Sequence, residues 1–584
     1  MTLAAERARL GREPISWVEI DADTCTRVYG TAPCTAAVGV TGQRKCYNTR
    51  KTCQDVAAFN RATSTYRFSA LVTTWASPLV PSIPCLLSVQ PTAGRIDPKG
   101  LGTRGTVTVQ MQDFATADRE DPYPTSRPWG THAAGTWWVR FLARQPYLEG
   151  RSLRLVTGYA APGGGYDATN MQVQAYVIDR ITGPDASGTV SITARDPLAL
   201  TDNDKSQFPA PTGAALRDAI NAVQTTAILR DGNGAKLPSS GSLIIGKEIM
   251  SFTRTGDALT VARAQQGTTA ATAAAGAAVQ AVTGFTAAPI ANVLGILLNA
   301  AGIPDTQLDL AGWATECDRW LPGNTLTVIL TKPAGIKSLI AEVCEQGQVA
   351  IWWDTRAQLV RLRALRPALR DEVTDLTDTA HLLAGSVQVT TDPTQRVSAV
   401  AVYFDLLGPN EDPTKPASYR QAYVQADIEA GDPDGLQYRS ERTRTILARW
   451  LGSAEATQAE TLAVRTLLLY RDPPRTINFK LDAKDSALWT GHAVTITTRQ
   501  ITDDTGAPLP VVALLTEAKE TTDGTEFSYQ ASGIGVTTRY AIITDDAAPD
   551  YTAASPAERD PGGYISTDVA DSRMSNGDEP YRIY

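Results

Sequence analysis

Histidine, basic charge and long apolar runs are all scarce in this sequence of 584 residues, and each scarcity argues against a class of function. The three histidines, His132, His381 and His492, fall in separate regions of the chain. That distribution offers neither the paired histidines of a metalloprotease nor an obvious catalytic triad. The sequence also lacks a G-x-S-x-G elbow and a Walker motif. We therefore predict that the protein is not an enzyme.

Basic residues are too few for a nucleic-acid-binding protein. The formal net charge is -8 and the pI is about 5.2. Proteins that bind DNA need a footprint of Lys and Arg that neutralises phosphates. Specific DNA binding is therefore not expected, although an acidic surface suits a protein that DNA merely passes through.

Apolar runs are short throughout. None approaches the roughly 20 residues that would span a bilayer, and the opening MTLAAERARLGREP lacks the apolar centre of a signal peptide. We expect a protein without a membrane anchor that is made in a reducing cytoplasm. Stable disulfides are disfavoured there, and an odd total of seven cysteines also argues against a fully paired set.

What the sequence does contain is typical of β structure. It has 45 glycines, 35 prolines and many short Thr- and Val-rich runs, which favour strands joined by turns. Residues 106–114 alternate between apolar and polar, as a half-buried strand does. Apolar stripes at helical spacing predict helices at 290–301, 336–347 and about 454–470. The predicted class is mainly β with an α/β segment.

A chain of this length exceeds one core, so we expect several domains. Turn residues, and changes between the two-residue hydrophobic period of strands and the 3.6-residue period of helices, divide the chain into six parts. These are an N-terminal β region (1–201), a linker (202–226), a small accessory β module (227–282), an α/β domain (283–370), a C-terminal β domain (371–544) and an acidic arm (545–584). In the long loop before residue 139, Trp129, Trp137 and Trp138 are candidates either for an interface or for a β core.

Four of the cysteines are concentrated between residues 25 and 53. Cys25, Cys34, Cys46 and Cys53 are separated by eight, eleven and six residues, and five Lys or Arg residues lie among them. Cations favour the thiolate form, which binds metal. This pattern is compatible with three interpretations: an iron-sulfur cluster, a zinc ion, or scattered buried thiols that bind nothing. Cys85 and Cys344 sit among apolar neighbours and are predicted to be core thiols, whereas Cys317 is expected in a loop beside Trp320.

The motifs YGTAPC and KCYNTRKTCQD, ahead of the strand TYRFSAL, resemble the N-terminal part of tail-tip hub proteins of long-tailed bacteriophages and gene transfer agents. The alanine-rich stretch ARAQQGTTAATAAAGAAV looks like an accessory β module of phage tail proteins. The resemblance implies a baseplate-hub-like architecture of β barrels or sandwiches with a helix-hairpin domain. It also implies a four-iron (4Fe-4S) cluster, with zinc as the alternative, held by Cys25, Cys34, Cys46 and Cys53.

On this resemblance the expected function is a structural hub of the tail tip. It would form a ring, as a homotrimer, that joins the distal tail protein ring and the tape-measure protein to the tip or fibre proteins and gates DNA exit. Its expected location is the tail of the virion. Two alternatives are an iron-sulfur redox or electron-transfer protein and a tail-associated cell-wall-degrading enzyme. The first would need a cofactor fold or second redox centre, and the second a paired-carboxylate or histidine-metal site.

Overall fold

The computed structural model describes residues 2–37, 40–41, 46–70, 82–97, 100–115, 136–160, 170–368, 372–431 and 440–533, with short pieces at 438, 539–541, 555, 565–566 and 581–583. Strand accounts for 43% and helix for 20%, so the predicted mainly β class with an α/β segment is confirmed. Arg44, Lys45, Trp129, His132 and most of the arm at 545–584 lie outside the described residues.

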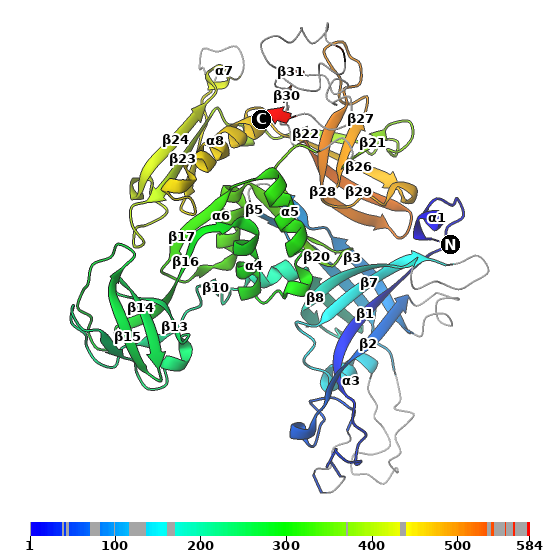
Figure 1. The fold of residues 1–584 in the computed structure, drawn as a ribbon. Coiled ribbons are helices and arrows are strands. Elements are labelled where there is room, and N and C mark those ends of the chain that lie inside the picture. Colours follow the sequence, from blue (N-terminus) through cyan, green and yellow to red (C-terminus); the bar gives the residue numbers. More distant parts are fainter. Residues whose placement is uncertain are drawn as a thin grey trace.

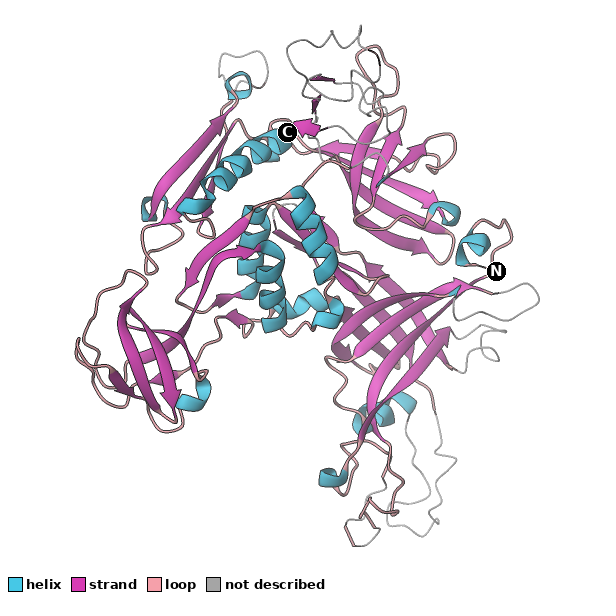
Figure 2. Cartoon of the chain, in the orientation of Figure 1, coloured by secondary structure: helices cyan, strands magenta, loops and turns pink. Residues whose placement is uncertain are grey.

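The N-terminal region is a closed β-barrel (Figures 1 and 2). All neighbouring strands are antiparallel except β2 and β3, which run parallel. Alternate residues point inward, so Val18, Ile20 and their counterparts fill a core that helix α3 (Trp137–Arg144) covers with Trp138 and Phe141. In order around the barrel the strands are β1 (Pro14–Cys25), β2 (Arg61–Ala70), β3 (Ile83–Thr92), β6 (Thr106–Gln112), β9 (Thr189–Arg195), β8 (Gln172–Thr182) and β7 (Ser152–Tyr159).

One sequence-based expectation changes here, and another is confirmed. Trp137 and Trp138, expected in a long surface loop, open helix α3. Trp138 is fully buried, and its ring stacks on Phe68 with centroids 5.1 Å apart, so it belongs to the β core and is no interface anchor. The alternation predicted at 106–114 is confirmed, because Val107, Val109 and Met111 of β6 are all buried.

A small β module follows the barrel and stands apart from the rest of the chain (Figure 1). Its sheet has its own core, and its strands β14 and β15 meet at the predicted turn. An internal ion pair, Arg263 to Glu248 at 2.7 Å, closes one side. The strands run β11 (Ala214–Ala215), β16 (Ala278–Pro289), β13 (Ser240–Ile245), β14 (Glu248–Thr255), β15 (Ala258–Gln265) and β12 (Thr226–Ile228), with β17 (Thr325–Leu330) also paired to β16.

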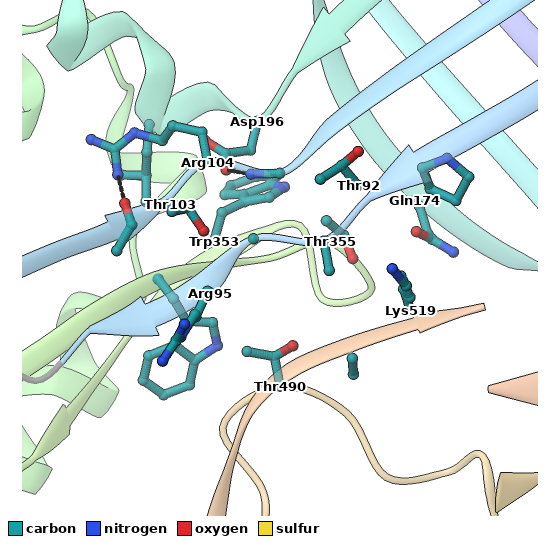
Figure 3. A pocket seen from close by; sticks show the side chains of 18 of the residues that line it. Thr92, Arg95, Thr103, Arg104, Gln174, Asp196, Trp353, Thr355, Thr490 and Lys519 are labelled. Carbon is teal, nitrogen blue, oxygen red and sulfur yellow. Dashed lines mark hydrogen bonds between the residues drawn. The ribbon is translucent and has the colours of Figure 1, made fainter. Parts of the chain in front are cut away.

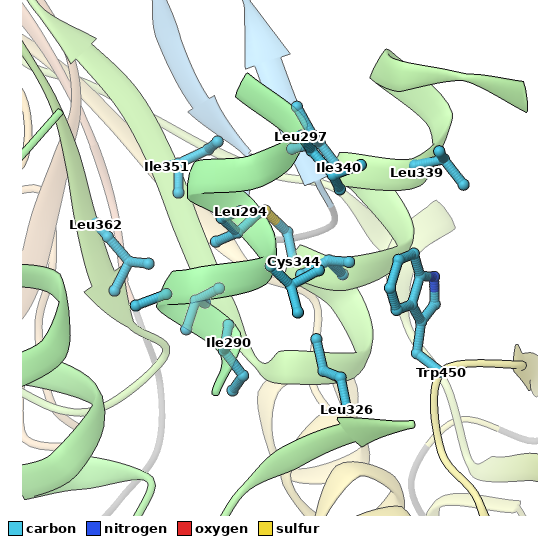
Figure 4. Packing of buried hydrophobic residues seen from close by; sticks show 14 of the residues in the cluster. Ile290, Leu294, Leu297, Leu326, Leu339, Ile340, Cys344, Ile351, Leu362 and Trp450 are labelled. Carbon is cyan, nitrogen blue, oxygen red and sulfur yellow. The ribbon is translucent and has the colours of Figure 1, made fainter. Parts of the chain in front are cut away.

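The largest core belongs to the α/β segment (Figure 4). Helix α4 (Ile290–Ala300) packs on α6 (Ile336–Gly347) through the apolar stripes that the sequence predicts, and Cys344 is buried among them. Cys317 is a correction: it lies in helix α5 (Leu310–Trp320) rather than in a loop, and it too is buried. The hairpin of β19 (Val349–Asp354) and β20 (Leu359–Ala364) completes this layer.

Two sheets form the C-terminal part. The three-stranded sheet packs on helix α8 (Ala456–Tyr470) and shares the large α/β core; in order it contains β24 (Tyr419–Ala426), β23 (Ala399–Leu406) and β25 (Thr443–Ala448). The six-stranded sheet has a core of its own. Its order is β21 (Val373–Thr377), β27 (Ala493–Thr497), β28 (Val511–Thr522), β29 (Glu526–Ser532), β26 (Arg475–Asp482) and β22 (Gln388–Thr391).

A short hairpin ties these parts together. Strands β4 (Arg95–Asp97) and β5 (Gly100–Thr103) leave the barrel between β3 and β6, and Ile96 packs with Ala350 of β19 and Leu514 of β28. The fit depends on glycine. A Cβ on Gly102 would lie 1.6 Å from the carbonyl oxygen of Arg95, and one on Gly100 would lie 3.0 Å from the Cβ of Ala341 on α6. Gly102 therefore lets the two strands of the hairpin approach each other, and Gly100 lets the hairpin approach α6 closely.

Candidate metal site

The strand that leads to the cysteines is held in place by a ladder of ions on the outside of the barrel. Arg154 of β7 donates to Glu19 at 3.0 Å and to Asp21 at 2.6 Å, and Arg67 of β2 donates to Glu19 at 2.9 Å. Burial raises the pKa of Glu19, but hydrogen bonds from Arg67, Trp17 and Arg154 outweigh it and hold that pKa below its ordinary value. The ladder supports β1 where it lies between β2 and β7; β1 pairs with β7 up to Ile20 and with β2 up to its last residue, Cys25.

Cys25 ends β1 and the other three cysteines follow it, at the end of the barrel away from the C-terminal sheet (Figure 1). All four are free thiols of intermediate exposure. The amide of Cys25 donates to the carbonyl of Asn48 at 2.7 Å, which brings the start of the loop against its later half. The amide of Asn48 in turn donates to the sulfur of Cys46 at 3.4 Å. Such N–H···S contacts also support metal-bound thiolates.

The thiols are close enough to affect one another. Burial raises the pKa of Cys46, and the charges of Cys53, Cys25 and Cys34 raise it further, against a backbone hydrogen bond from Asn48 that lowers it. Like charges perturb a thiol in this way only over short distances. The other three thiols of the loop therefore act on Cys46 through their charges.

The four thiols are not arranged as a metal site in this structure. Among the described residues, no group of three or more His, Cys, Asp or Glu side chains is placed to hold a metal ion. The donor set itself fits a soft metal or an iron-sulfur cluster, because four thiolates are the ligands such centres prefer. Five basic and no acidic residues lie between Cys25 and Cys53, which suits a site that becomes anionic when loaded.

A set of polar side chains that the sequence-based analysis did not single out braces the loop. Gln54 accepts hydrogen bonds from Tyr29 at 3.1 Å and from Thr41 at 2.8 Å. Asp55 accepts from Thr35 and caps the short helix η1 (Val56–Ala58). These contacts fasten the stretch after Cys53 to the stretches on both sides of Cys34. The signal that could have found them is the Gln-Asp pair directly after the last cysteine, an aspartate in a helix-capping position.

One contact anchors the loop to the barrel cap. The guanidinium of Arg144, in the last turn of α3, lies 3.6 Å from the ring centroid of Tyr47. Tyr47 directly follows Cys46, so this cation–π contact sets the position of the third cysteine.

The other titratable candidates are structural. Burial raises the pKa of Cys85, Cys317 and Cys344 to about 12 each, as expected of thiols packed in apolar cores. The predictions for Cys85 and Cys344 are thereby confirmed. Nδ1 of His381 accepts the amide of Thr377 at 3.2 Å, and Nδ1 of His492 accepts that of Trp489 at 3.1 Å.

No protein-family model matches the chain, and no curated protein matches its sequence. Solved structures similar to it include the 43 kDa tail protein of prophage MuSo2 from Shewanella oneidensis, at 9% identity and a TM-score of 0.37, covering 77% of this chain and 98% of that one. A tail protein from Neisseria meningitidis MC58 shares 12% identity over 74% of this chain and 89% of its own, with a TM-score of 0.34. A chain of the virion of a native gene transfer agent particle shares 12% identity over 63% of this chain and 79% of its own, with a TM-score of 0.27. Likenesses this distant leave the function to be argued from the chain itself.

No helix among the described residues is long and apolar enough to cross a membrane.

Proposed function

We propose that this chain is a structural hub of a bacteriophage tail tip, or baseplate, located in the tail of the virion. The observation that carries the proposal is a closed β-barrel whose strand β1 leads into a loop with four free cysteines, within the sequence motifs that resemble tail-tip hubs. The rest of the chain, a series of β domains around one α/β core, suits a scaffold that presents several faces to partners.

The cofactor of the proposal is a four-iron cluster on Cys25, Cys34, Cys46 and Cys53, with zinc as the alternative. Its role would be to staple the loop, because metal-binding energy at a thiolate site becomes folding energy for irregular backbone. The hydrogen bonds of Gln54 and Asp55 would bring the loop near its final path, so that a small movement of the cysteines completes the site. A redox role would need a second centre or a cofactor fold, and nothing described in the chain favours one.

In the proposed assembly, three copies of the protein form a ring between the distal tail protein ring and the tip or fibre proteins. The tape-measure protein and DNA would lie inside this ring. Strand β24 supports a role in assembly, because it forms an edge of its sheet and carries one charge in eight residues. Val424 of this strand is 60% exposed. Uncharged edge strands of this length readily pair with another chain. The net charge of -8 fits a channel that DNA passes without binding.

Localisation in purified particles tests the proposal. An antibody or gold label on an exposed turn of the accessory module, at Gly256, should mark the tail tip in electron micrographs, one cluster per particle. A label on the tail tube, on the capsid or on no particle would contradict the proposal, whatever metal the cysteines hold.

A further inference from the structure

A small cavity lies where four parts of the chain meet (Figure 3). Its volume is about 40 Å³, and it lies against the barrel, the β4–β5 hairpin, the β19–β20 hairpin and strand β28. One ordered water needs about 10–15 Å³ on the same measure. The cavity therefore has room for a few waters or one small tetrahedral ion.

Buried polar atoms without partners converge on this cavity. Within the part of the chain that the structure describes, Asp196 Oδ1, Arg104 Nε, Trp352 Nε1 and Thr355 Oγ1 are inaccessible and make no hydrogen bond, and all four residues line the cavity. Asp196 is only 4% exposed, and its other oxygen accepts the amide of Gly105 at 2.6 Å. Native proteins rarely leave buried polar atoms unpaired, so their concentration here indicates a missing partner.

Three cationic side chains and two carboxylates line the cavity. Arg95 of β4 and Lys519 of β28 join Arg104, whose terminal nitrogens already bind Gly102, Thr201 and Asp202. Of the two carboxylates, Glu520 is engaged with the amide of Gly524. Figure 3 shows Asp196 and Arg104 on one side of the loop that carries Thr355, and Lys519 on the other.

We propose that this cavity binds a small tetrahedral oxyanion such as inorganic phosphate. Lys519 and Arg95 supply its counter-charge, and Trp352, Thr355 and Arg104 donate hydrogen bonds to its oxygens. The site is too small and enclosed for a phosphate that remains part of a polymer. The ion would connect Lys519 of the C-terminal sheet to Asp196 and Arg104 of the barrel, and so act as a joint between domains whose cores are otherwise separate.

Asp196 makes the binding depend on pH. It faces Arg104 and Asp202 at the barrel's edge, Tyr176 on β8, Arg95 on β4, and Lys519 and Glu520 on β28. Burial, against the attraction of Arg104, raises the pKa of Asp196 to about 6. Its ionised form would repel the anion, whereas its protonated form can donate a hydrogen bond to it. Anion binding is therefore expected to take up a proton and to weaken as the pH rises above about 6.

The test is titration of the full-length protein with inorganic phosphate, by calorimetry and thermal denaturation, against chloride at matched ionic strength. At about pH 5.5, phosphate should raise the melting temperature and chloride should not. Lys519→Gln should weaken phosphate binding by about tenfold or more, because it removes a charged donor. Lys332→Gln, which removes an exposed lysine outside the cavity, should bind as the wild type does.

Two further variants keep the proposal testable if Lys519→Gln fails to fold. Trp352→Phe removes the indole N–H while keeping an aromatic ring, and should weaken phosphate binding by about threefold to tenfold. Asp196→Asn should bind phosphate at about pH 8 as tightly as the wild type does at about pH 5.5. Equal melting temperatures in phosphate and chloride, equal binding by Lys519→Gln and Lys332→Gln, or loss of binding in Asp196→Asn would each overturn the proposal.

Discussion

The α/β core and the cysteine loop are stabilised by different means. Around α4 and α6, Val293, Leu294, Leu339 and Ile340 are fully buried, and order follows mainly from apolar packing. In the loop no side chain other than Thr49 and Ala36 is buried among the described residues, and order depends on a handful of hydrogen bonds. A segment of the second kind needs an additional cross-link to be rigid, and four thiols in one loop are suited to supply it.

The largest expected effect comes from removing volume in the core. Leu294→Ala should lower the free energy of unfolding of the α/β segment by about 2–5 kcal/mol, because it deletes buried methyl groups and leaves a cavity. Ile296→Ala on the same helix, where the side chain is 45% exposed, should cost less than about 1 kcal/mol. Denaturant unfolding measures both. Similar losses in the two variants would contradict the account of the core.

The ion ladder should matter next, since it supports the strand that carries Cys25. Arg154→Met should destabilise the barrel by about 1–3 kcal/mol, because it leaves Glu19 and Asp21 without a shared partner. Arg217→Met, in an exposed pair with Asp218, should leave stability unchanged.

The same ladder predicts a dependence on acid. The pKa values of Glu19 and Asp21 are lowered in the folded protein, so their contribution is complete above the unfolded values of 4.5 and 3.8 and is lost as the pH falls below them. In thermal melts between about pH 3 and 7, the melting temperature of the wild type should fall more steeply on acidification than that of Arg154→Met. Parallel curves would argue that the ladder contributes nothing.

A smaller and local effect is expected from the loop's polar brace. Thr35→Val removes the donor to Asp55 and should speed amide hydrogen exchange at residues 46–58 by roughly tenfold, with no change in the core helices. Thr414→Val, which removes a similar contact to Asp412 in an exposed turn, serves as the control. Exchange that rises equally in α4 would show that the loop and the core are one cooperative unit.

The smallest effect on the metal-free protein should come from the cysteines of the loop. Cys46→Ser should leave its melting temperature almost unchanged, because this thiol is half exposed. Cys344→Ser should lower stability by about 1–3 kcal/mol, because it buries a hydroxyl in an apolar core. Only Cys46→Ser should abolish metal binding. Retention of metal by Cys46→Ser would remove it from the ligand set.

Local pattern was enough to predict much of the secondary structure. The stripe from Ile290 to Leu298 defined α4, the alternation from Val107 to Met111 defined β6, and α8 ends at Tyr470 before two prolines, as expected. These elements are set by neighbours within a few residues, which periodicity records.

Long-range features were not predictable in the same way. Closure of the barrel pairs Pro14 with Tyr159, and the β4–β5 hairpin docks on Ala341. Neither contact can be recognised from the spacing of apolar and polar residues along the sequence. Trp138 was misplaced because proline and charge before it predict a loop, whereas contact with Phe68 places it in the core. For the cysteines, the sequence and its family resemblance predicted four metal ligands, which stays a prediction; the polar residues that brace the loop emerged only from the fold.

The proposed metal centre of the cysteine loop can be tested directly. The most direct test is an anaerobic absorbance spectrum of the full-length protein together with iron, sulfide and zinc analysis. The account predicts broad absorption near roughly 400 nm with iron and sulfide in equal amounts, about four of each per chain, lost in Cys46→Ser. One zinc per chain would indicate that a zinc ion, rather than an iron-sulfur cluster, cross-links the cysteine loop. A protein that binds neither after reconstitution would contradict the claim and leave the four thiols as ordinary surface-loop cysteines.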